Sequence, residues 1–547
     1  MKLRQHLFFW AILLASLSAC KTQKVPSENR QSSSEIGKKP PLVEASKFPE
    51  KTLSKSPVAL LPLNYSLPEI PREFRGVWIA TVVNIDWPEA GTDPWPKQKS
   101  DFIALLDHYK KLNFNAVIVQ VRTAGDAFYP SRYAPWSRYL TGKEGKAPNT
   151  TENPLTWMIK QAHDRGLEFH AWLNPYRATF DDKTNLLSSE HDFNLHRDWM
   201  LKYGSKYYYD PGMPAVKEKL VAVIKELVEN YSIDAIHFDD YFYPYKIGNQ
   251  VFPDQKSYTQ YKKPGQSLED WRRQNVNELI RAAHEVIKNT KPWVQFGISP
   301  FGVWRNSDKD PKGSSTRAGQ TNFDDLYADP LAWMQNGWID YLIPQIYWSM
   351  DYDLASYQKL NDWWSANSFG TNVYIGNGPY KIRDNADKAW ENPREINNQV
   401  NYTRTLPTIQ GNAFFSAKSL FSKNQDVANL LQEELYDRPT LPPAFEPKMT
   451  SIIETPSVFQ VEATQDWTRI TLEKPLDPAI RYAMIQGADE LTDLSDAEIH
   501  TVWVGGTRAR QLEVSSLHTN YLAVRWIDHY GRIVQTQVFQ TPKKTRP

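Results

Sequence analysis

The sequence predicts an α/β fold: a (β/α)8 barrel of the TIM-barrel type over residues 71–438, followed by a small all-β sandwich over residues 447–547. Two observations predict the barrel. Short apolar runs alternate eight times with segments of helical periodicity, as parallel strands joined by crossover helices do. The ends of these runs are also rich in polar and aromatic residues, whereas their beginnings are bland, and active sites of barrels form at the carboxyl ends of the strands.

The apolar runs have the length and composition of strands that are buried on both faces. We keep a doubly wound open sheet as the alternative, although no glycine-rich phosphate loop opens a helix. Helical periodicity is found at Asp101–Leu112, Pro154–Arg165, Ala215–Tyr231 and Leu268–Asn289. The predicted strands are Arg75–Val83, Ala116–Arg122, Glu168–Pro175, Ala235–Pro244, Gln295–Trp304, Asp340–Ser349, Asn372–Gly378 and Asn412–Leu420.

The first twenty residues have the features of an export signal. Lys2 and Arg4 precede an apolar run, Leu7–Leu17, that is too short to span a bilayer. The run leads into Leu17-Ser18-Ala19-Cys20, which resembles the lipobox of bacterial lipoproteins, and Cys20 is the only cysteine of the chain. We therefore predict a signal peptide over residues 1–20 and a lipid on Cys20 that binds the protein to a membrane. The alternative is an ordinary signal peptide with an incidental cysteine.

Residues 21–70 are rich in Ser, Lys, Pro and Glu and lack apolar periodicity, so we predict a flexible tether with a reach of roughly 40 Å. No acidic residue directly follows Cys20. We accordingly expect a protein of the cell envelope, anchored to the outer membrane and facing the periplasm.

Composition restricts the class of partner. The chain has 64 basic and 63 acidic residues, and this balance argues against nucleic acid as a partner. Aromatic residues make up 13% of the chain, which fits either sugar-stacking surfaces or a Trp-rich core. We expect no cofactor and no metal, and the sequence leaves the oligomeric state open.

Alternation of side chains along the strands predicts which residues face the barrel lumen. On four strands one face is strongly polar while the other suits a helix layer. The predicted lumen residues are Gln120, Arg122, His170, Trp172, Asn174, His237, Asp239, Gln345 and Tyr347.

Asp239 is our candidate for the nucleophile or base of a glycoside hydrolase, because such enzymes use two carboxyl groups and Asp239 ends the fourth strand. We expect Asp240 at the rim, pointing to the opposite side, where it orients Asp239 or contacts sugar. Asp351 is the first choice for the second carboxyl group, with Asp126 and Asp86 as alternatives. Loop capping or a metal site is the competing interpretation of Asp239-Asp240.

Further polar and aromatic residues at the strand ends are candidates for substrate binding. Arg122 has an alternative role as a structural partner of Asp126 or Asp239, and each aromatic residue has plain packing as its alternative. The candidates are Arg122, Asp126, Asn174, Tyr176, Arg177, Tyr241, Tyr243, Trp304, Gln345, Tyr347 and Trp348.

Three motifs resemble the bacterial glycosyl-hydrolase-like 10 family of lipoproteins: Phe74-Arg75-Gly76-Val77-Trp78-Ile79-Ala80-Thr81, Ile236-His237-Phe238-Asp239-Asp240-Tyr241-Phe242-Tyr243-Pro244 and Pro344-Gln345-Ile346-Tyr347-Trp348. The resemblance covers about Arg72 to Arg438. It implies a TIM barrel related to glycoside hydrolases with the fourth-strand aspartates at the active site. It also implies a cell-wall glycan as substrate, namely the glycan strands of peptidoglycan.

After the Pro-rich junction Arg438–Pro447, seven short alternating runs predict the β-sandwich. Leu517-His518-Thr519-Asn520-Tyr521 resembles the fibronectin type III pattern. We favour a spacer or docking module over a glycan-binding module. The runs are Ser457–Ala463, Thr468–Lys474, Ile480–Gln486, Thr501–Gly505, Gln511–Val514, Tyr521–Ile527 and Ile533–Gln540.

Three functions remain open at this point. The main hypothesis is a membrane-anchored hydrolase of envelope glycan. A non-catalytic glycan-binding lipoprotein is the second, and the lack of an obvious catalytic Glu at a strand end favours it. The third is a deacetylase or amidase on the same barrel, which would need a metal.

Overall fold

The computed structural model describes residues 58–59, 61–445, 453–463, 466–505, 508–515, 517 and 519–541. The predicted signal peptide, Cys20 and most of the predicted tether lie outside these residues. In the described part of the chain, no helix has the length and apolar character needed to cross a membrane.

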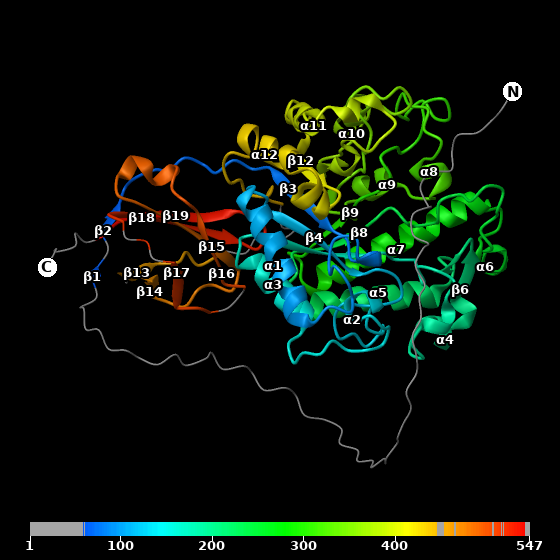
Figure 1. Ribbon diagram of the computed structural model, residues 1–547, viewed down its shortest axis with the longest axis horizontal. Coiled ribbons are helices and arrows are strands. Elements are labelled where there is room, and N and C mark those ends of the chain that lie inside the picture. The colour runs from blue at the N-terminus through cyan, green and yellow to red at the C-terminus, as the bar shows by residue number, and fades with distance from the viewer. Residues whose placement is uncertain are drawn as a thin grey trace, which may run out of the picture. The chain divides into compact units, whose positions relative to one another are not determined.

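Eight parallel strands form a closed barrel, which confirms the predicted TIM barrel and shows that the open-sheet alternative is wrong (Figure 1). Several strands are shorter than predicted, because the polar residues after them leave the sheet and form loops. The strands are β3 (Phe74–Ile79), β4 (Ala116–Arg122), β5 (Glu168–Leu173), β8 (Ala235–Phe238), β9 (Gln295–Ile298), β10 (Tyr341–Leu342), β11 (Asn372–Asn377) and β12 (Ile409–Phe414).

Helices cover the outside of the barrel, and short elements lie in its loops (Figure 1). The Asn153 side chain accepts hydrogen bonds from the first backbone N–H groups of one covering helix, and Ser267 does so for another. The covering helices are α1 (Trp95–Lys111), α3 (Pro154–His163), α5 (Pro214–Asn230), α7 (Leu268–Thr290), α9 (Pro330–Gln335), α10 (Tyr357–Ala366), α11 (Glu395–Arg404) and α12 (Gln425–Glu434). The loop elements are α2 (Arg138–Thr141), α4 (Asp192–Leu195), α6 (Gln255–Tyr261), α8 (Asn322–Asp325) and the hairpin of β6 (Met200–Tyr203) and β7 (Lys206–Tyr209).

Two apolar layers stabilise the barrel. The larger one lies between strands and helices, and its side chains come from the outward positions of the strands, such as Val119, Phe169 and Phe296. The smaller one fills the lumen with bulky side chains, among them Trp78 and Tyr341. The lumen is therefore a packed floor and not a pore.

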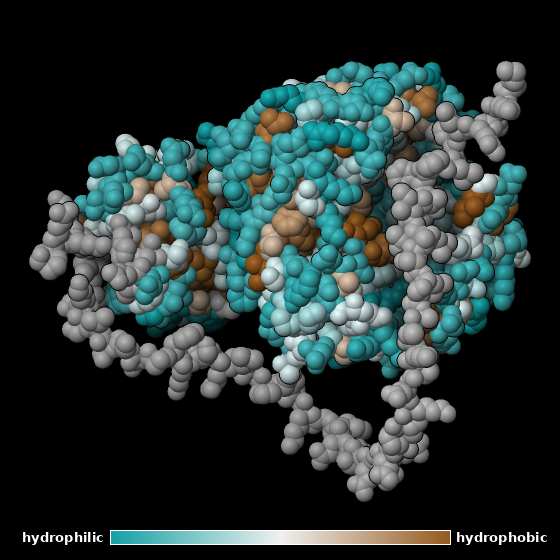
Figure 2. Space-filling model, in the orientation of Figure 1, coloured by the Kyte–Doolittle hydropathy of each residue, from teal (hydrophilic) through white to brown (hydrophobic). Residues whose placement is uncertain are grey.

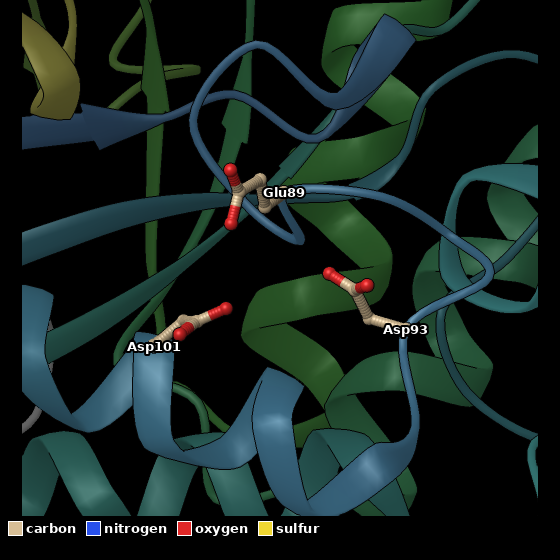
Figure 3. Close-up of side chains that lie close together, drawn as sticks. All are labelled: Glu89, Asp93 and Asp101. Atoms are coloured by element: carbon tan, nitrogen blue, oxygen red, sulfur yellow. The ribbon is translucent and has the colours of Figure 1, made fainter.

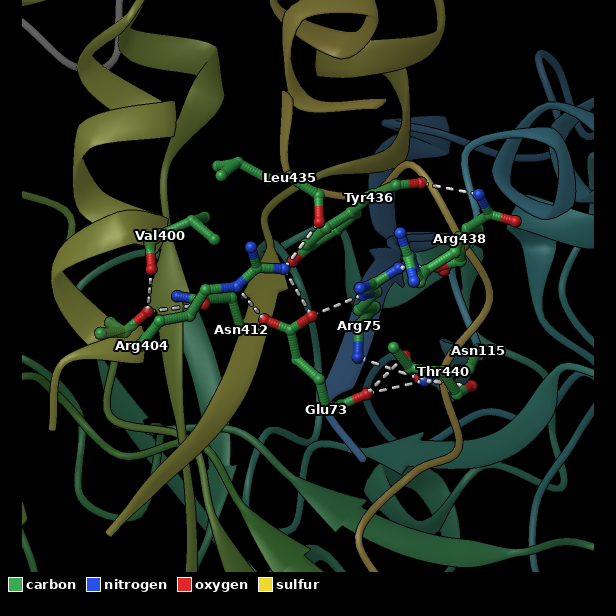
Figure 4. Close-up of polar contacts among 12 residues, drawn as sticks. Glu73, Arg75, Asn115, Val400, Arg404, Asn412, Leu435, Tyr436, Arg438 and Thr440 are labelled. Carbon is green, nitrogen blue, oxygen red and sulfur yellow. Dashed lines mark hydrogen bonds and ion pairs between the residues drawn. The ribbon is translucent and has the colours of Figure 1, made fainter. Parts of the chain in front are cut away.

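An ion-pair network closes the base of the barrel where β12 meets β3 (Figure 4). The Glu73 carboxylate accepts from Arg75 Nε at 2.7 Å and from Arg404 Nε and Nη2, both at 2.8 Å. Arg75 also lies over the Tyr436 ring, with its guanidinium carbon 4.0 Å from the ring centroid. The network holds the segment that leaves the barrel after α12 against the strand that begins it.

The C-terminal part is a two-sheet β-sandwich, as predicted, and each of the seven predicted runs overlaps a strand. The fibronectin type III resemblance stays a prediction. One sheet has the order β1-β13-β14-β17 and the other β16-β15-β18-β19-β2. The strands are β13 (Val458–Ala463), β14 (Trp467–Leu472), β15 (Ile480–Ala488), β16 (His500–Trp503), β17 (Gln511–Ser515), β18 (Tyr521–Asp528) and β19 (Ile533–Gln540).

The end of the predicted tether differs from our prediction. Residues Val58–Ala59 (β1) pair with β13, and Leu61–Leu63 (β2) pair with the edge of β19. Leu63 is half-buried against the sandwich, whereas Leu61 is 62% exposed. The segment was missed because a strand of two residues and a strand of three residues that contains Pro62 carry no detectable period. One face of the described surface is largely hydrophilic with scattered apolar patches (Figure 2).

We predict that Leu63→Asp lowers the unfolding free energy of the protein by ~1–3 kcal/mol, because a carboxylate would replace a packed side chain. Leu61→Asp in the same strand is the matched control and should change it by less than about 0.5 kcal/mol. Thermal and urea unfolding measure both. Equal effects would show that β2 does not pack on the sandwich.

Candidate active site

Asp239 and Asp240 directly follow β8 at the carboxyl end of the barrel, and both side chains are buried, with 4% and 3% exposed. The strand ends at Phe238, so the alternation of a strand no longer applies to the two aspartates. We had expected Asp240 at the rim, but its side chain is buried beside Asp239. Two neighbouring carboxyl groups instead share the floor of the barrel mouth.

The Asp239 carboxylate lies among hydrogen-bond donors. Trp172 Nε1 donates to Oδ2 at 3.1 Å, and Asn174 Nδ2 donates to Oδ1 and Oδ2 at 3.0 and 3.1 Å. Burial raises the pKa of Asp239, while the Arg177 guanidinium and these donors act in the opposite direction. The donors favour the ionised form of this carboxyl group over the protonated form.

Asp240 has a different environment. The Tyr245 hydroxyl donates a short hydrogen bond to Oδ2, and the Gln345 side chain is a second partner. Burial and the negative charge of Asp239 raise the pKa of Asp240 to about 7. The pKa of both carboxyl groups is raised by burial, but only Asp240 is raised further by the charge of its neighbour, so Asp240 is the one of the two that keeps its proton to higher pH.

Partly exposed aromatic side chains surround the two carboxyl groups. Arg177 lies over the Tyr241 ring at 4.5 Å, and the Tyr245 ring lies 5.4 Å from the Tyr241 ring. The Tyr245 ring also meets Phe301 edge-on, and Phe301 meets Trp348 at 5.6 Å. Flat apolar faces next to a pair of carboxyl groups are suited to bind sugar rings.

The structure brings together part of the predicted substrate-binding set. Asn174, Arg177, Tyr241 and Gln345 lie around the two aspartates, and the charge of Asp240 is one of the causes that raise the pKa of the Tyr347 hydroxyl. Trp348 is joined to this group through Phe301.

Three predicted aromatic residues lie elsewhere. Tyr176 is buried near Asp210, Tyr243 packs between Phe252 and Tyr327, and Trp304 donates through Nε1 to Asp329 at 3.1 Å. These positions follow strand ends in sequence, but the loops turn their side chains into the outer core. The structure therefore supports the alternative interpretation of these three residues, namely that they pack in the core.

Arg122 does not face the lumen. An irregularity in the pairing of β4 with β5 follows Gln120 and sets Arg122 opposite Leu173, an outer-core residue. Arg122 consequently points toward the Tyr209 ring. Asp126 is also structural, because its carboxylate accepts from Thr123 N, Thr123 Oγ1 and Ala124 N in its own loop.

The candidates for the second carboxyl group are not where we expected a proton donor. Asp351 lies exposed in the loop after β10. Its negative charge is one of the causes that raise the pKa of Glu395. Asp86 is buried but accepts from Ala80 N, Ser416 Oγ and Lys418 N, so it joins two loops. In the described part of the chain, no hydrogen bond or ion pair links Asp351 or Asp86 to Asp239 or Asp240.

Sequence reasoning missed Tyr245 and Phe301 and listed Trp172 as a lumen residue only. Tyr245 ends the aromatic run that begins at Tyr241, and this run was the available signal. Phe301 lies in a strand-end segment that we had recognised as polar and aromatic. Their contacts to Asp240 and Trp348 depend on loop conformation, which the sequence pattern does not encode.

One cluster of possible metal ligands is found among the described residues, and it lies away from the aspartates. Figure 3 shows Glu89, Asp93 and Asp101, whose carboxylate oxygens converge at the start of α1. Lys97 Nζ approaches all three carboxylates, at 2.8, 3.3 and 2.7 Å. The lysine ammonium neutralises the charge that would attract a cation.

Comparison with known proteins agrees with the family resemblance of the motifs. The family model "Glycosyl hydrolase-like 10" matches residues 73–392. The chain is 48% identical over 396 residues to "Glycosyl hydrolase YngK" of Bacillus subtilis, covering 70% of this chain and 77% of that protein. It is 36% identical over 364 residues to "Glycosyl hydrolase DigH" of Escherichia coli K12, covering 62% and 82%.

Among solved structures, the PgaB glycoside hydrolase domain from Bordetella bronchiseptica aligns with a TM-score of 0.41 and 13% identity, covering 66% of this chain and 98% of that one. The family model spans more than half of the chain and includes β8 with the two aspartates that follow it. The protein belongs to the glycosyl hydrolase-like 10 family.

Proposed function

We propose that the protein is a membrane-anchored glycoside hydrolase that cleaves a bacterial envelope glycan, the glycan strands of peptidoglycan. The observation that carries the proposal is the unequal pair of buried carboxyl groups at the barrel mouth. Asp239 is surrounded by donors that favour its ionised form, and burial together with that charge raises the pKa of Asp240 to about 7. A glycosidase needs one group of each kind.

In the proposed reaction, Asp240 donates its proton to the oxygen of the scissile glycosidic bond as the bond to the anomeric carbon breaks. The Asp239 carboxylate stabilises the positive charge that develops on the sugar, acting as nucleophile or base. If Asp239 is the nucleophile, it forms a bond to the anomeric carbon, and water then displaces it while giving its proton to the Asp240 carboxylate. If Asp239 is the base, it takes the proton from the water whose hydroxyl group bonds to the anomeric carbon, and release of that proton to solvent and uptake of another by Asp240 complete the cycle. Trp172 and Asn174 hold the Asp239 carboxylate in place through the reaction.

The substrate class follows from the site and the predicted export signal. Aromatic faces around uncharged and paired polar groups suit a carbohydrate chain, and the family name points to glycoside hydrolysis. A lipid on Cys20 would keep the enzyme in the envelope, on the outer membrane facing the periplasm, where peptidoglycan is the abundant glycan. The C-terminal sandwich would be carried with the barrel to this location.

A non-catalytic glycan-binding lipoprotein is the second candidate. One observation favours it. Asp351, which we expected to supply the second carboxyl group from a facing loop, is exposed, and its charge raises the pKa of Glu395 and not that of Asp239 or Asp240. A binder would retain glycan without turnover, and its affinity would not depend on which carboxyl group is protonated.

We predict that the chain from residue 57 onward releases saccharide fragments from peptide-stripped glycan strands, each cut adding one water. Mass spectrometry of the products identifies the bond. Asp239→Asn should abolish release, whereas Asp351→Asn, an exposed aspartate with the same substitution, should cleave normally. Retention of glycan without any release by the unmodified chain would instead favour the binding protein.

Substrates with good leaving groups separate the roles of the two aspartates. Asp240→Asn should lose roughly 10³-fold in rate on natural glycan, because protonation of the leaving oxygen is lost. It should keep most of its rate on a dinitrophenyl glycoside, which needs no proton, while Asp239→Asn loses both activities. Equal losses of Asp240→Asn on both substrates would contradict the assignment of Asp240 as the acid.

The pH dependence tests the same assignment. Because Asp240 must be protonated, kcat/KM should fall as pH rises through about 7. The Tyr245 hydrogen bond lowers the pKa of Asp240, so Tyr245→Phe should move this alkaline limb to higher pH. Tyr176→Phe is the matched control from the outer core and should leave the limb in place. A limb that moves to lower pH in Tyr245→Phe would refute the account.

A further inference from the structure

A buried arginine of the sandwich reaches the base of the barrel. Arg481 lies on β15, is 3% exposed, and forms two ion pairs with the barrel. Its Nη1 is 2.9 Å from Glu168 Oε1, and its Nη2 is 2.6 Å from Asp234 Oδ1. Glu168 begins β5 and Asp234 immediately precedes β8, so both carboxylates lie at the end of the barrel opposite the candidate active site.

Further contacts hold the Arg481 side chain in place. Its guanidinium lies 4.8 Å from the Trp503 ring, and Trp503 stacks on His163 of the barrel at 3.4 Å. His163 Nε2 in turn contacts Asp234 Oδ2 at 2.9 Å. Burial raises the pKa of Glu168, but Arg481 and His170 outweigh burial and hold that pKa below its usual range. Glu168 is therefore ionised and can only accept hydrogen bonds.

A chain of hydrogen bonds runs from Glu168 through the lumen. Glu168 Oε2 is 3.1 Å from His170 Nε2, and His170 Nδ1 is 2.8 Å from the Tyr341 hydroxyl. The same hydroxyl is 3.0 Å from His237 Nδ1. His237 Nε2 is then 2.9 Å from Ser299 Oγ and 3.3 Å from Trp78 Nε1. All of these side chains are buried.

When both histidine rings are neutral, the two ends of the chain fix the direction of the hydrogen bonds between them. Trp78 Nε1 can only donate, so His237 Nε2 accepts and the proton of that ring is on Nδ1. His237 Nδ1 then donates to Tyr341, and Tyr341 donates to His170 Nδ1. His170 carries its proton on Nε2 and donates it to the Glu168 carboxylate. Burial keeps the pKa of His237 well below its usual range, which is consistent with a neutral ring.

The upper end of the chain lies beneath the two aspartates. Gln345 Nε2 donates to the Ser299 carbonyl at 2.8 Å, and the Gln345 side chain also binds Asp240. On the other side, Trp172 pairs in register with His237 across β5 and β8 and donates to Asp239. The orientation of the His237 ring therefore affects Gln345 and Trp172, the residues beneath the two carboxyl groups.

We propose that Arg481 is a positioning residue for the candidate active site, acting through Glu168, His170, Tyr341 and His237 on the floor beneath Asp239 and Asp240. The sandwich is then a working part of the barrel and not a spacer. The effect on catalysis rests on the proposed hydrolase function, but the effect on the histidine rings does not.

The test is nitrogen-15 NMR of histidine side chains in the chain from residue 57 onward, with glycan hydrolysis measured in parallel. The unmodified protein should show His170 protonated on Nε2 and His237 on Nδ1. In Arg481→Met, the pKa of Glu168 should rise because the neighbouring positive charge is lost, so the His170 tautomers should become mixed, while Trp78 keeps the His237 proton on Nδ1. The value of kcat should fall by roughly 10- to 100-fold with KM unchanged.

Arg72→Met is the matched control. Arg72 also joins barrel and sandwich, donating to the carbonyls of Pro442 at 2.9 Å and Gly531 at 2.8 Å, but none of these bonds involves the lumen chain. This variant can lose stability, yet it should keep both tautomers and kcat. Arg481→Lys, which retains the positive charge, should restore the tautomers at least in part.

Tyr341→Phe decides the matter if Arg481→Met fails to fold, because it removes one buried hydroxyl and leaves the Arg481 ion pairs intact. It removes the hydroxyl that donates to His170 Nδ1, so it should mix the His170 tautomers and lower kcat. Unchanged tautomers and kcat in folded Arg481→Met, or in Tyr341→Phe, would overturn the proposal. Absence of hydrolysis by every protein, together with the expected tautomer changes, would overturn the hydrolase function and leave the positioning chain standing.

Discussion

Burial of two neighbouring carboxyl groups at the mouth of a closed barrel is the constraint on which the rest of the site depends. Two adjacent negative charges out of water are costly unless one of them is neutralised by a proton or both are compensated. Here the compensation is unequal: Trp172 and Asn174 donate to Asp239, whereas Asp240 has Tyr245 and Gln345 and the repulsion of its neighbour. The asymmetry raises the pKa of Asp240 to about 7, while the donors around Asp239 favour the ionised form of that group. The aromatic residues around the pair supply the faces on which a sugar chain can lie.

Much of the fold could be predicted from the sequence, because strands buried on both faces and the helices that cover them have separate periods. The eight-strand barrel and the β-sandwich are confirmed. The boundaries were less accurate: the fourth barrel strand ends at Phe238, six residues before the predicted end at Pro244. Leu61–Leu63 was assigned to the tether because a strand of three residues with a proline shows no period, and only pairing with β19 makes it a strand.

The site could be predicted most directly where side chains project from regular strands. His170, Trp172 and His237 face the lumen as the alternation predicts, and they contact its floor. The predicted lumen position of Arg122 is wrong because an irregularity in the strand pairing turns its side chain to the other face of the barrel wall. Tyr176 and Tyr243 were assigned to the substrate site, but they lie in loops, where side-chain direction follows no period, and both are buried in the outer core. Asp240 was assigned to the opposite side of Asp239 by extending the strand one step too far. The ion pairs of Arg481 with Glu168 and Asp234 could not be predicted from the sequence, because they depend on how the sandwich packs against the barrel.

Titration of the aspartate carboxyl carbons by carbon-13 NMR tests the central claim most directly. The account predicts one aspartate with a pKa near 7, absent in Asp240→Asn and shifted to lower pH in Asp239→Asn, where the neighbouring charge is gone. If no aspartate titrates near 7, or if the titration near 7 persists in Asp240→Asn, the two carboxyl groups are not an acid and its ionised partner, and the proposed chemistry is wrong.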